Sequence, residues 1–89
     1  MKDYVFKQNK EVIFRDEGDE AIIFNPQNSE IIVINSIGRF IWSLCDGKNT
    51  KKEILKKILD EFEVSSEKAE QDLDKFLTDL EKAAFIKQG

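Results

Sequence analysis

Few side chains in this 89-residue chain are able to do chemistry. It has one cysteine, Cys45, no histidine, and 18 aspartates and glutamates. Structural zinc needs about four Cys or His ligands, and a nucleophilic triad needs a histidine or an equivalent base. Cys45 falls on the apolar stripe of an expected helix, which indicates a small buried hydrophobe. The carboxylates stand at helix-surface or turn spacing, and we find no phosphate loop or cofactor motif. We therefore expect no catalytic residues, no metal site and no cofactor.

One segment of the sequence is a candidate binding site, because it is apolar on both faces of a strand. Glu30 to Ile34 reads Glu-Ile-Ile-Val-Ile, and in a three-stranded meander it must be an edge strand. Natural sheet edges are usually blunted by Lys, Pro or a bulge, since unpaired backbone groups recruit other strands. Nothing blunts this edge after Glu30. Either a helix of the same domain covers it, or it is open for an extended peptide to add a strand.

A second candidate surface is one flank of the last expected helix. Its core stripe centres near Leu73 and Leu80, and this places four other side chains along one flank. The flank mixes an aromatic ring with both signs of charge, as the wall of a peptide groove would: Asp72, Lys75, Phe76 and Asp79. For the charged residues, ordinary solvated helix surface is the alternative interpretation.

The first third of the chain is typical of β-strands. Val12 to Phe14 and Ala21 to Phe24 flank a turn in which Gly18 can take a positive φ. A second turn, Asn25 to Ser29, leads into the Glu30 to Ile34 strand. We expect a three-stranded antiparallel meander.

Three helices follow in the expected order. In the first, Asn35 or Ser36 is the N-cap, an apolar stripe runs from Ile37 to Cys45, and Gly47 fits the left-handed position past the end. The second opens with a Thr50 and Glu53 capping box. The third starts at Ser65 or Ser66. Its stripe is Ala69, Leu73, Phe76, Leu77, Leu80 and Ala84, and Phe85 and Ile86 close the core. The fold class is α+β with a winged-helix-like order.

Gly38 and Trp42 stand one helical turn apart, beside the main stripe of the first helix. The missing side chain at Gly38 lets the indole or a neighbouring backbone come close. We interpret both as residues that anchor the helix on the sheet, in preference to ligand contacts.

Charge argues against nucleic acid as the partner. From Ser65 to Lys82 there are six acidic residues and three lysines, and the whole chain has a net charge of −4. A helix with this balance would be repelled by DNA phosphates. The sequence also shows no signal peptide and no apolar segment of membrane-spanning length, so a cytoplasmic location is the default expectation.

The chain resembles the PqqD-like domains, also called RiPP recognition elements. The resemblance covers about residues 11–87 and rests on these residues: Asn35, Gly38, Ile41, Trp42, Asp46, Gly47, Glu53, Ile54, Asp72, Phe76, Leu77, Leu80, Phe85 and Ile86. Two departures stand out. Ala84 replaces a frequent glycine, and the first ten residues match nothing that we assign.

The resemblance implies a domain at 11–87, preceded by an unassigned segment at 1–10. It also implies a non-catalytic module that binds the leader of a ribosomally made precursor peptide and delivers it to a radical-SAM enzyme, a cyclodehydratase or a leader protease. The leader would add as a strand to Glu30, Ile31, Ile32, Val33 and Ile34, beside a helix wall of Asp72, Lys75, Phe76 and Asp79. The alternatives are a winged-helix transcription regulator and an assembly subunit that dimerises through its edge strand.

Overall fold

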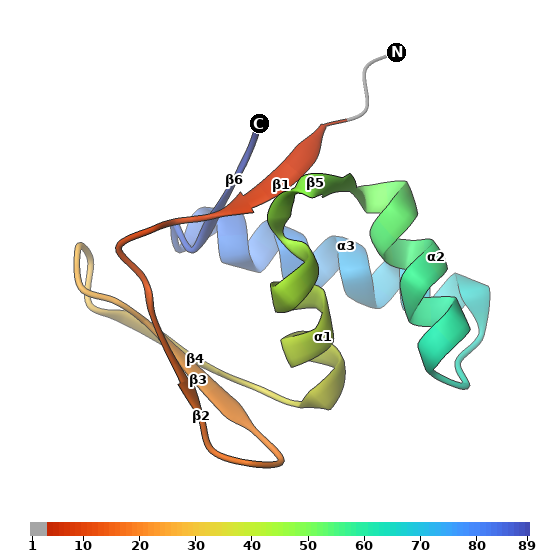
Figure 1. Cartoon of the computed structure of the whole chain (residues 1–89), viewed down its shortest axis with the longest axis horizontal. Coiled ribbons are helices and arrows are strands. Elements are labelled where there is room, and N and C mark those ends of the chain that lie inside the picture. Colours follow the sequence, from red (N-terminus) through yellow and green to blue (C-terminus); the bar gives the residue numbers. More distant parts are fainter. Residues whose placement is uncertain (1–3) are drawn as a thin grey trace.

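The computed structural model describes residues 4–89 and contains two small sheets and three helices (Figure 1). Residues 1–3 of the unassigned N-terminal segment lie outside the described residues. The strands are β1 (Val5–Gln8), β2 (Ile13–Asp16), β3 (Ala21–Asn25), β4 (Glu30–Ile34), β5 (Asp46–Thr50) and β6 (Ile86–Gln88). The helices are α1 (Ser36–Leu44), α2 (Lys51–Glu61) and α3 (Ser66–Lys82).

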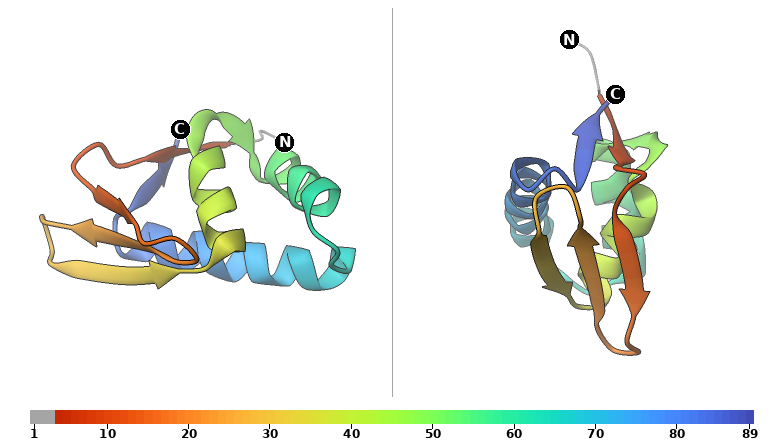
Figure 2. Two further views of the ribbon diagram at one scale, coloured as in Figure 1. Left: turned by 60° about the horizontal axis from the view of Figure 1, so that its bottom comes forward. Right: turned by 90° about the vertical axis from the view of Figure 1, so that its left-hand side faces the viewer.

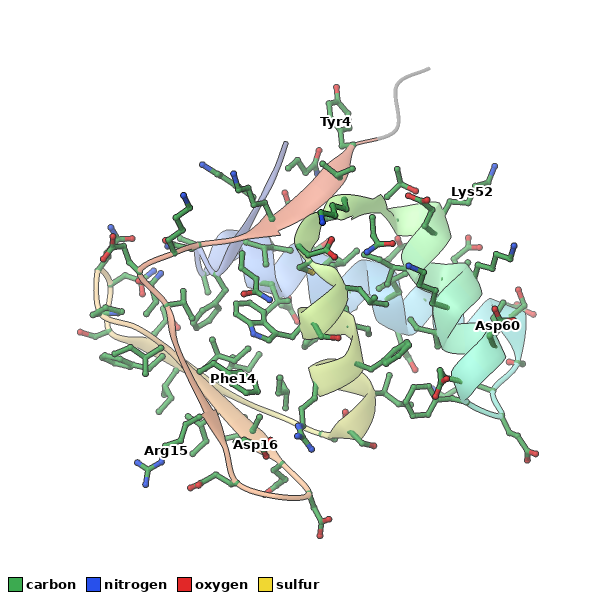
Figure 3. All side chains as sticks on the ribbon, in the orientation of Figure 1. Tyr4, Phe14, Arg15, Asp16, Lys52 and Asp60 are labelled. Atoms are coloured by element: carbon green, nitrogen blue, oxygen red, sulfur yellow. The ribbon has the colours of Figure 1, made fainter. Side chains whose placement is uncertain are left out.

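The antiparallel meander expected from the sequence is confirmed as a sheet of order β2-β3-β4. Ala21 pairs with Ile34, and Ile23 pairs with Ile32. Gly18 has a φ of 93°, as the β2-β3 turn requires, and its amide donates to Asp16 Oδ1 at 2.9 Å. Side chains alternate across the strands, and Figure 3 shows Phe14 and Arg15 on opposite sides of β2.

The β3-β4 turn fastens this sheet to the end of α3. Asn25 is fully buried, and its side-chain amide donates to the carbonyl oxygens of Ala83 and Ala84, each at 3.1 Å. Asn28 donates to the same Ala83 oxygen at 2.9 Å. The Asn25 Oδ1 atom also accepts from the Gln27 amide, so a single side chain shapes the turn and fixes its position on the helix.

The helix starts lie where the sequence predicts them. Asn35 accepts from the Gly38 amide, Thr50 and Glu53 form a complete capping box, and Ser65 accepts from the Lys68 amide. Each cap satisfies a backbone N–H that has no partner within its helix. The three helices therefore begin at residues that the local sequence specifies.

The core lies between the meander and the three helices, and β1 and β6 each contribute a residue to it. Trp42 is 5% exposed and Cys45 is fully buried, in agreement with their interpretation as core residues. The buried apolar side chains are Phe6, Ala21, Ile23, Ile34, Ile41, Trp42, Cys45, Ile54, Ile58, Ala69, Leu73, Leu77, Leu80, Phe85 and Ile86. Phe76 is only half-buried, although the sequence places it on the same helical stripe.

The second sheet, of order β5-β1-β6, was not predicted from the sequence. It pairs residues from the start, the middle and the end of the chain, and β1 and β6 lie side by side in Figure 2. Its strands β5 and β6 are short and rich in polar residues, so they carry little apolar alternation. Gly47 has the expected positive φ, 81°, but it lies within β5 rather than directly after the helix.

Ala84 is a correction to the expected α3 stripe. The helix ends at Lys82 with Ala83 as its C-cap, so Ala84 lies outside it, is exposed, and has a φ of 60°. This is the left-handed conformation that glycine adopts most easily, which gives a physical reason for the glycine preferred by the resembling domains.

Candidate functional site

The β4 strand is at the edge of its sheet, and among the residues that the structure describes its only neighbour is β3. Within residues 4–89, the backbone groups of residues 31–34 form no hydrogen bond outside the ladder to β3. In an edge strand, alternate N–H and C=O groups point away from the neighbouring strand and stay available to a new one. One long side of β4 thus offers a template for strand addition.

The two faces of β4 differ in their surroundings. Ile32 and Ile34 face the helices, where Ile34 is buried and Ile32 is half-buried. Ile31 and Val33 face outward and are 62% and 57% exposed. A peptide beside β4 would therefore find apolar side chains on both faces of the strand.

A groove of about 430 Å³ lies between β4 and α3, and α1 contributes part of its lining. Its apolar lining residues are Ile32, Val33, Ile34, Ile37 and Ile41, with Phe76 opposite them on α3. The remaining lining residues are Glu20, Asn35, Gly38 and Asp72. Apolar walls with a few polar groups are typical of ligand sites.

Gly38 determines how closely α1 approaches β4. A Cβ atom at this position would lie 2.9 Å from Ile34 Cβ and 3.4 Å from Phe76 Cζ. The first distance is shorter than side-chain carbons tolerate, so any larger residue would push the helix and the strand apart. The glycine identified in the sequence as an anchor is therefore also part of the groove.

Five of the nine predicted peptide-binding residues line this groove: Ile32, Val33, Ile34, Asp72 and Phe76. The other four do not line it: Glu30, Ile31, Lys75 and Asp79. Glu30 and Ile31 continue the open edge of β4. Lys75 and Asp79 form an exposed ion pair at 3.1 Å along α3.

Sequence reasoning missed Glu20 and assigned Asn35 and Gly38 to the fold alone. The helical periodicity of the sequence already indicated that Ile37 and Ile41 lie on the inward face of α1, from which they reach the groove. No local pattern brings Glu20, which precedes β3, to the same groove as Asp72 on α3.

Burial and hydrogen bonding shift the pKa values of two adjacent residues, Cys45 and Asp46, in opposite directions. Burial raises the pKa of the Cys45 thiol to about 12, and the Asp46 charge adds to this. The pKa of Asp46 is lowered, chiefly because the backbone N–H of Lys48 donates to its carboxylate. Cys45 is therefore a neutral thiol, without the thiolate that reactive cysteines need.

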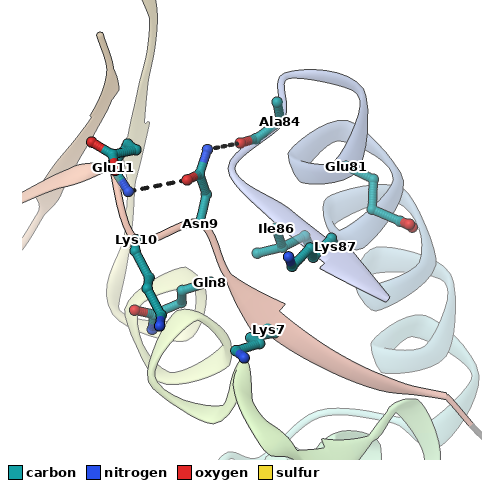
Figure 4. A pocket seen from close by; sticks show the side chains of 9 residues that line it. All are labelled: Lys7, Gln8, Asn9, Lys10, Glu11, Glu81, Ala84, Ile86 and Lys87. Atoms are coloured by element: carbon teal, nitrogen blue, oxygen red, sulfur yellow. Dashed lines mark hydrogen bonds between the residues drawn. The ribbon is translucent and has the colours of Figure 1, made fainter. Parts of the chain in front are cut away.

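A second cavity, of about 500 Å³, lies beside β1 and β6 (Figure 4). Its lining is mostly charged or amide-bearing, and Asn9 spans it by donating to the Ala84 oxygen at 2.9 Å. It lacks an open strand edge lined by apolar side chains, so the β4 groove is the better candidate.

No group of three potential metal ligands occurs in residues 4–89, and none of the helices described there is long and apolar enough to span a membrane.

Together, the fold and the groove define a class of protein: a small α+β domain of winged-helix-like order that presents an open sheet edge beside an apolar groove. The chain belongs to the PqqD family, "Coenzyme PQQ synthesis protein D", whose pattern it matches over residues 20–86. A comparison with curated proteins finds no match.

Solved structures share the fold along nearly the whole chain. One is TbiB1 in complex with the TbiA(beta) leader peptide, with a TM-score of 0.79, 26% identity, and coverage of 91% of this chain and 94% of that one. Another is lasso peptide synthetase B1 complexed with the leader peptide, with a TM-score of 0.76, 19% identity, and coverage of 92% and 96%. The heterocyclase TruD matches with a TM-score of 0.66 and 12% identity, over 97% of this chain but 12% of that one.

Proposed function

We propose that this chain is a non-catalytic module that captures the leader of a ribosomally made precursor peptide. The leader adds as a strand to β4, places alternate side chains in the β4-α3 groove, and is presented to a modifying enzyme. The observation that carries the proposal is the unpaired edge of β4 directly beside an apolar groove. Two solved relatives of the same fold are complexes with leader peptides, which supports this interpretation.

The groove gives an approximate affinity. A leader that buries two or three apolar side chains gains about 1.5–3 kcal/mol from each. Association and the ordering of an extended peptide consume part of this free energy. A micromolar dissociation constant corresponds to about 8 kcal/mol, so we expect the backbone hydrogen bonds to β4 to supply the remaining free energy and the affinity to be roughly micromolar. Backbone hydrogen bonds to β4 supply register, and the groove supplies the preference for apolar side chains.

The proposed partner is an enzyme that modifies the precursor, such as a radical-SAM enzyme, a cyclodehydratase or a leader protease. The heterocyclase TruD supports this proposal, because 12% of its length has the fold of the present chain. A separate module of this kind would raise the local concentration of the peptide at its enzyme.

Selection from a displayed library of random 16-residue peptides tests the proposal and does not require the sequence of the precursor. Selected peptides, made synthetically, should bind with one-to-one stoichiometry in calorimetry. In hydrogen exchange they should protect the amides of β4 and of the Asp72 to Asp79 flank. Enriched peptides that leave β4 unprotected, or the absence of any enrichment, would reject leader capture at this edge.

A pair of variants separates the groove from general stability. Phe76→Ala removes the aromatic wall of the groove and should weaken peptide binding by about tenfold or more. Phe62→Ala is the matched control, because this ring is also half-buried but stacks edge-on against Phe40, with ring centroids 5.4 Å apart, and does not line the groove. It should bind peptide as the unmodified chain does. Equal losses in both variants would contradict the assignment of the groove.

A further inference from the structure

The charged groups of the β4-α3 groove have one sign. In the part of the chain that the structure describes, its ionisable lining residues are Glu20 and Asp72, and no lysine or arginine lines it. The rest of the lining is apolar apart from Asn35 and Gly38. A peptide seated there therefore meets apolar residues and two carboxylates, one from the residue before β3 and one from α3.

Neither carboxylate is firmly engaged by the protein. The Glu20 side chain forms no hydrogen bond or ion pair with another residue between 4 and 89. Asp72 pairs with Lys68 at 3.3 Å, but the two side chains are 66% and 72% exposed, with Lys68 the more exposed. Exposed pairs one helical turn apart are weak, so a cation on a ligand competes readily with Lys68 for Asp72.

We infer that the groove selects peptides that carry a lysine or arginine next to the apolar residue that enters it, with Glu20 and Asp72 as the specificity-determining residues. This inference rests on the proposed function and adds the chemical class of the ligand. An acidic residue at the same place in the peptide would face two like charges, and an amide would gain less than a cation.

The positions of Glu20 and Asp72 explain why the preference for a basic residue applies to one place in the peptide. Glu20 precedes β3, next to the end of β4 at Ile34, whereas Asp72 lies on the α3 wall. A cation on the peptide has two carboxylates available in the groove lining, while the other lining residues are mostly isoleucine and phenylalanine. The preference should therefore depend on position within the peptide and should not reflect the net charge of −4 alone.

Parallel selections from the random 16-residue library test this inference. The library is selected on the unmodified chain and on the Glu20→Gln/Asp72→Asn double variant, which keeps shape and removes both charges. Peptides from the unmodified chain should carry Lys or Arg at a fixed spacing from an apolar residue. Peptides from the double variant should keep the apolar residue and lose the basic one.

Calorimetry on one selected peptide measures the effect. Replacing its basic residue by glutamine should weaken binding about threefold to tenfold on the unmodified chain and leave binding to the double variant unchanged. Lys68→Gln frees Asp72 and should tighten binding of the basic peptide. Asp74→Asn is the matched control, because Asp74 is also an exposed α3 carboxylate with a lysine partner, Lys51, but does not line the groove. It should have no effect.

The outcomes separate this inference from the proposed function. Peptides that protect β4 but show no basic preference would overturn the charge selectivity and leave leader capture standing. A double variant that loses stability while its peptide preference stays the same would mean that the two carboxylates stabilise the fold and do not select the peptide. A failure to enrich any peptide that protects β4 would reject leader capture itself.

Discussion

Gly38 and Ile34 hold α1 and β4 in direct contact. A Cβ atom at position 38 would lie 2.9 Å from Ile34 Cβ, closer than real side-chain carbons approach. This contact joins the buried end of the edge strand to the helix that contributes to the groove lining. The width of the groove therefore depends on the absence of a side chain at position 38.

Gly38→Ala should lower the free energy of unfolding by about 1–2 kcal/mol, because overpacking outweighs the better helix propensity of alanine. It should also weaken peptide binding, since the added methyl group points toward Ile34 and Phe76. Urea denaturation and calorimetry measure the two effects. Ser43→Ala, on the exposed face of α1, is the control and should change stability by less than about 0.5 kcal/mol. A stable Gly38→Ala variant with normal binding would show that α1 moves without cost.

Ala84→Gly should stabilise the fold by about 0.5–1 kcal/mol. Ala84 has a φ of 60°, a conformation that costs a side-chain-bearing residue more than it costs glycine, and the relief exceeds the added chain entropy of glycine when unfolded. Ala83→Gly is the adjacent control: its φ is −90°, so glycine should destabilise there. Thermal denaturation of both variants should give shifts of opposite sign, and a loss of stability in both would refute strain at Ala84.

Asn25→Ala should cost about 2–3 kcal/mol. The change removes a buried side chain that binds the Ala83 and Ala84 carbonyl oxygens and shapes the β3-β4 turn. Asn28→Ala removes two exposed hydrogen bonds, one donated to the Ala83 oxygen and one accepted from the Glu30 N–H, and should cost less than about 1 kcal/mol because water replaces both. Denaturant midpoints compare the two. Similar values would mean that the buried amide has no special part in joining the meander to α3.

Stability should fall in acid because of two hydrogen-bonded carboxylates. The pKa of Glu53 is lowered, first by the Thr50 backbone N–H, and that of Asp46 is lowered, first by the Lys48 backbone N–H. Each carboxyl therefore binds protons more readily in the unfolded chain than in the folded one. The stabilisation is complete above the ordinary pKa values, 4.5 for Glu53 and 3.8 for Asp46. It is lost as the pH falls through the lower pKa values of the folded protein.

Urea midpoints between pH 7 and pH 3 measure this dependence. Glu53→Gln should flatten it, because the amide does not titrate. Glu61→Gln, which replaces an α2 carboxylate that forms no hydrogen bond or ion pair with another residue between 4 and 89, is the control. If Glu53→Gln leaves the pH dependence of the urea midpoint unaltered, the capping box is not its source.

Cys45 should resist alkylation in the folded protein. Its thiol is fully buried, and burial raises its pKa to about 12, so both access and thiolate are lacking. Iodoacetamide at pH 8 should label it only when urea unfolds the chain, and the labelling rate should follow the unfolded fraction. Labelling of the native protein at the rate of a free thiol would place Cys45 at the surface.

Local sequence was sufficient for much of the fold. The Thr50 and Glu53 capping box, the Ser65 N-cap and the Gly18 turn form as predicted, because each depends on residues within one turn of the chain. The Glu30–Ile34 strand has the predicted bounds, because a continuous apolar run between a turn and a helix cap leaves little freedom.

Other elements depended on residues far apart in the chain. The polar β5 and β6 strands form only because β1 pairs with both of them. The third helix ends before Ala84, because the Ala83 and Ala84 carbonyls are held by Asn25 from the β3-β4 turn. Hydrophobic periodicity does not report such contacts, since it describes one element at a time.

The sequence by itself determined that an apolar strand without blunting charges ends the meander, because side-chain pattern and the short turns that connect β2, β3 and β4 are local properties. The tertiary structure decided that α1 adds to the lining of the space beside that strand, and that Glu20 and Asp72 lie in the same groove. The physical reason is close packing: the approach of α1 to Ile34 is fixed by the missing Cβ of Gly38, and this distance exists only once helix and sheet meet.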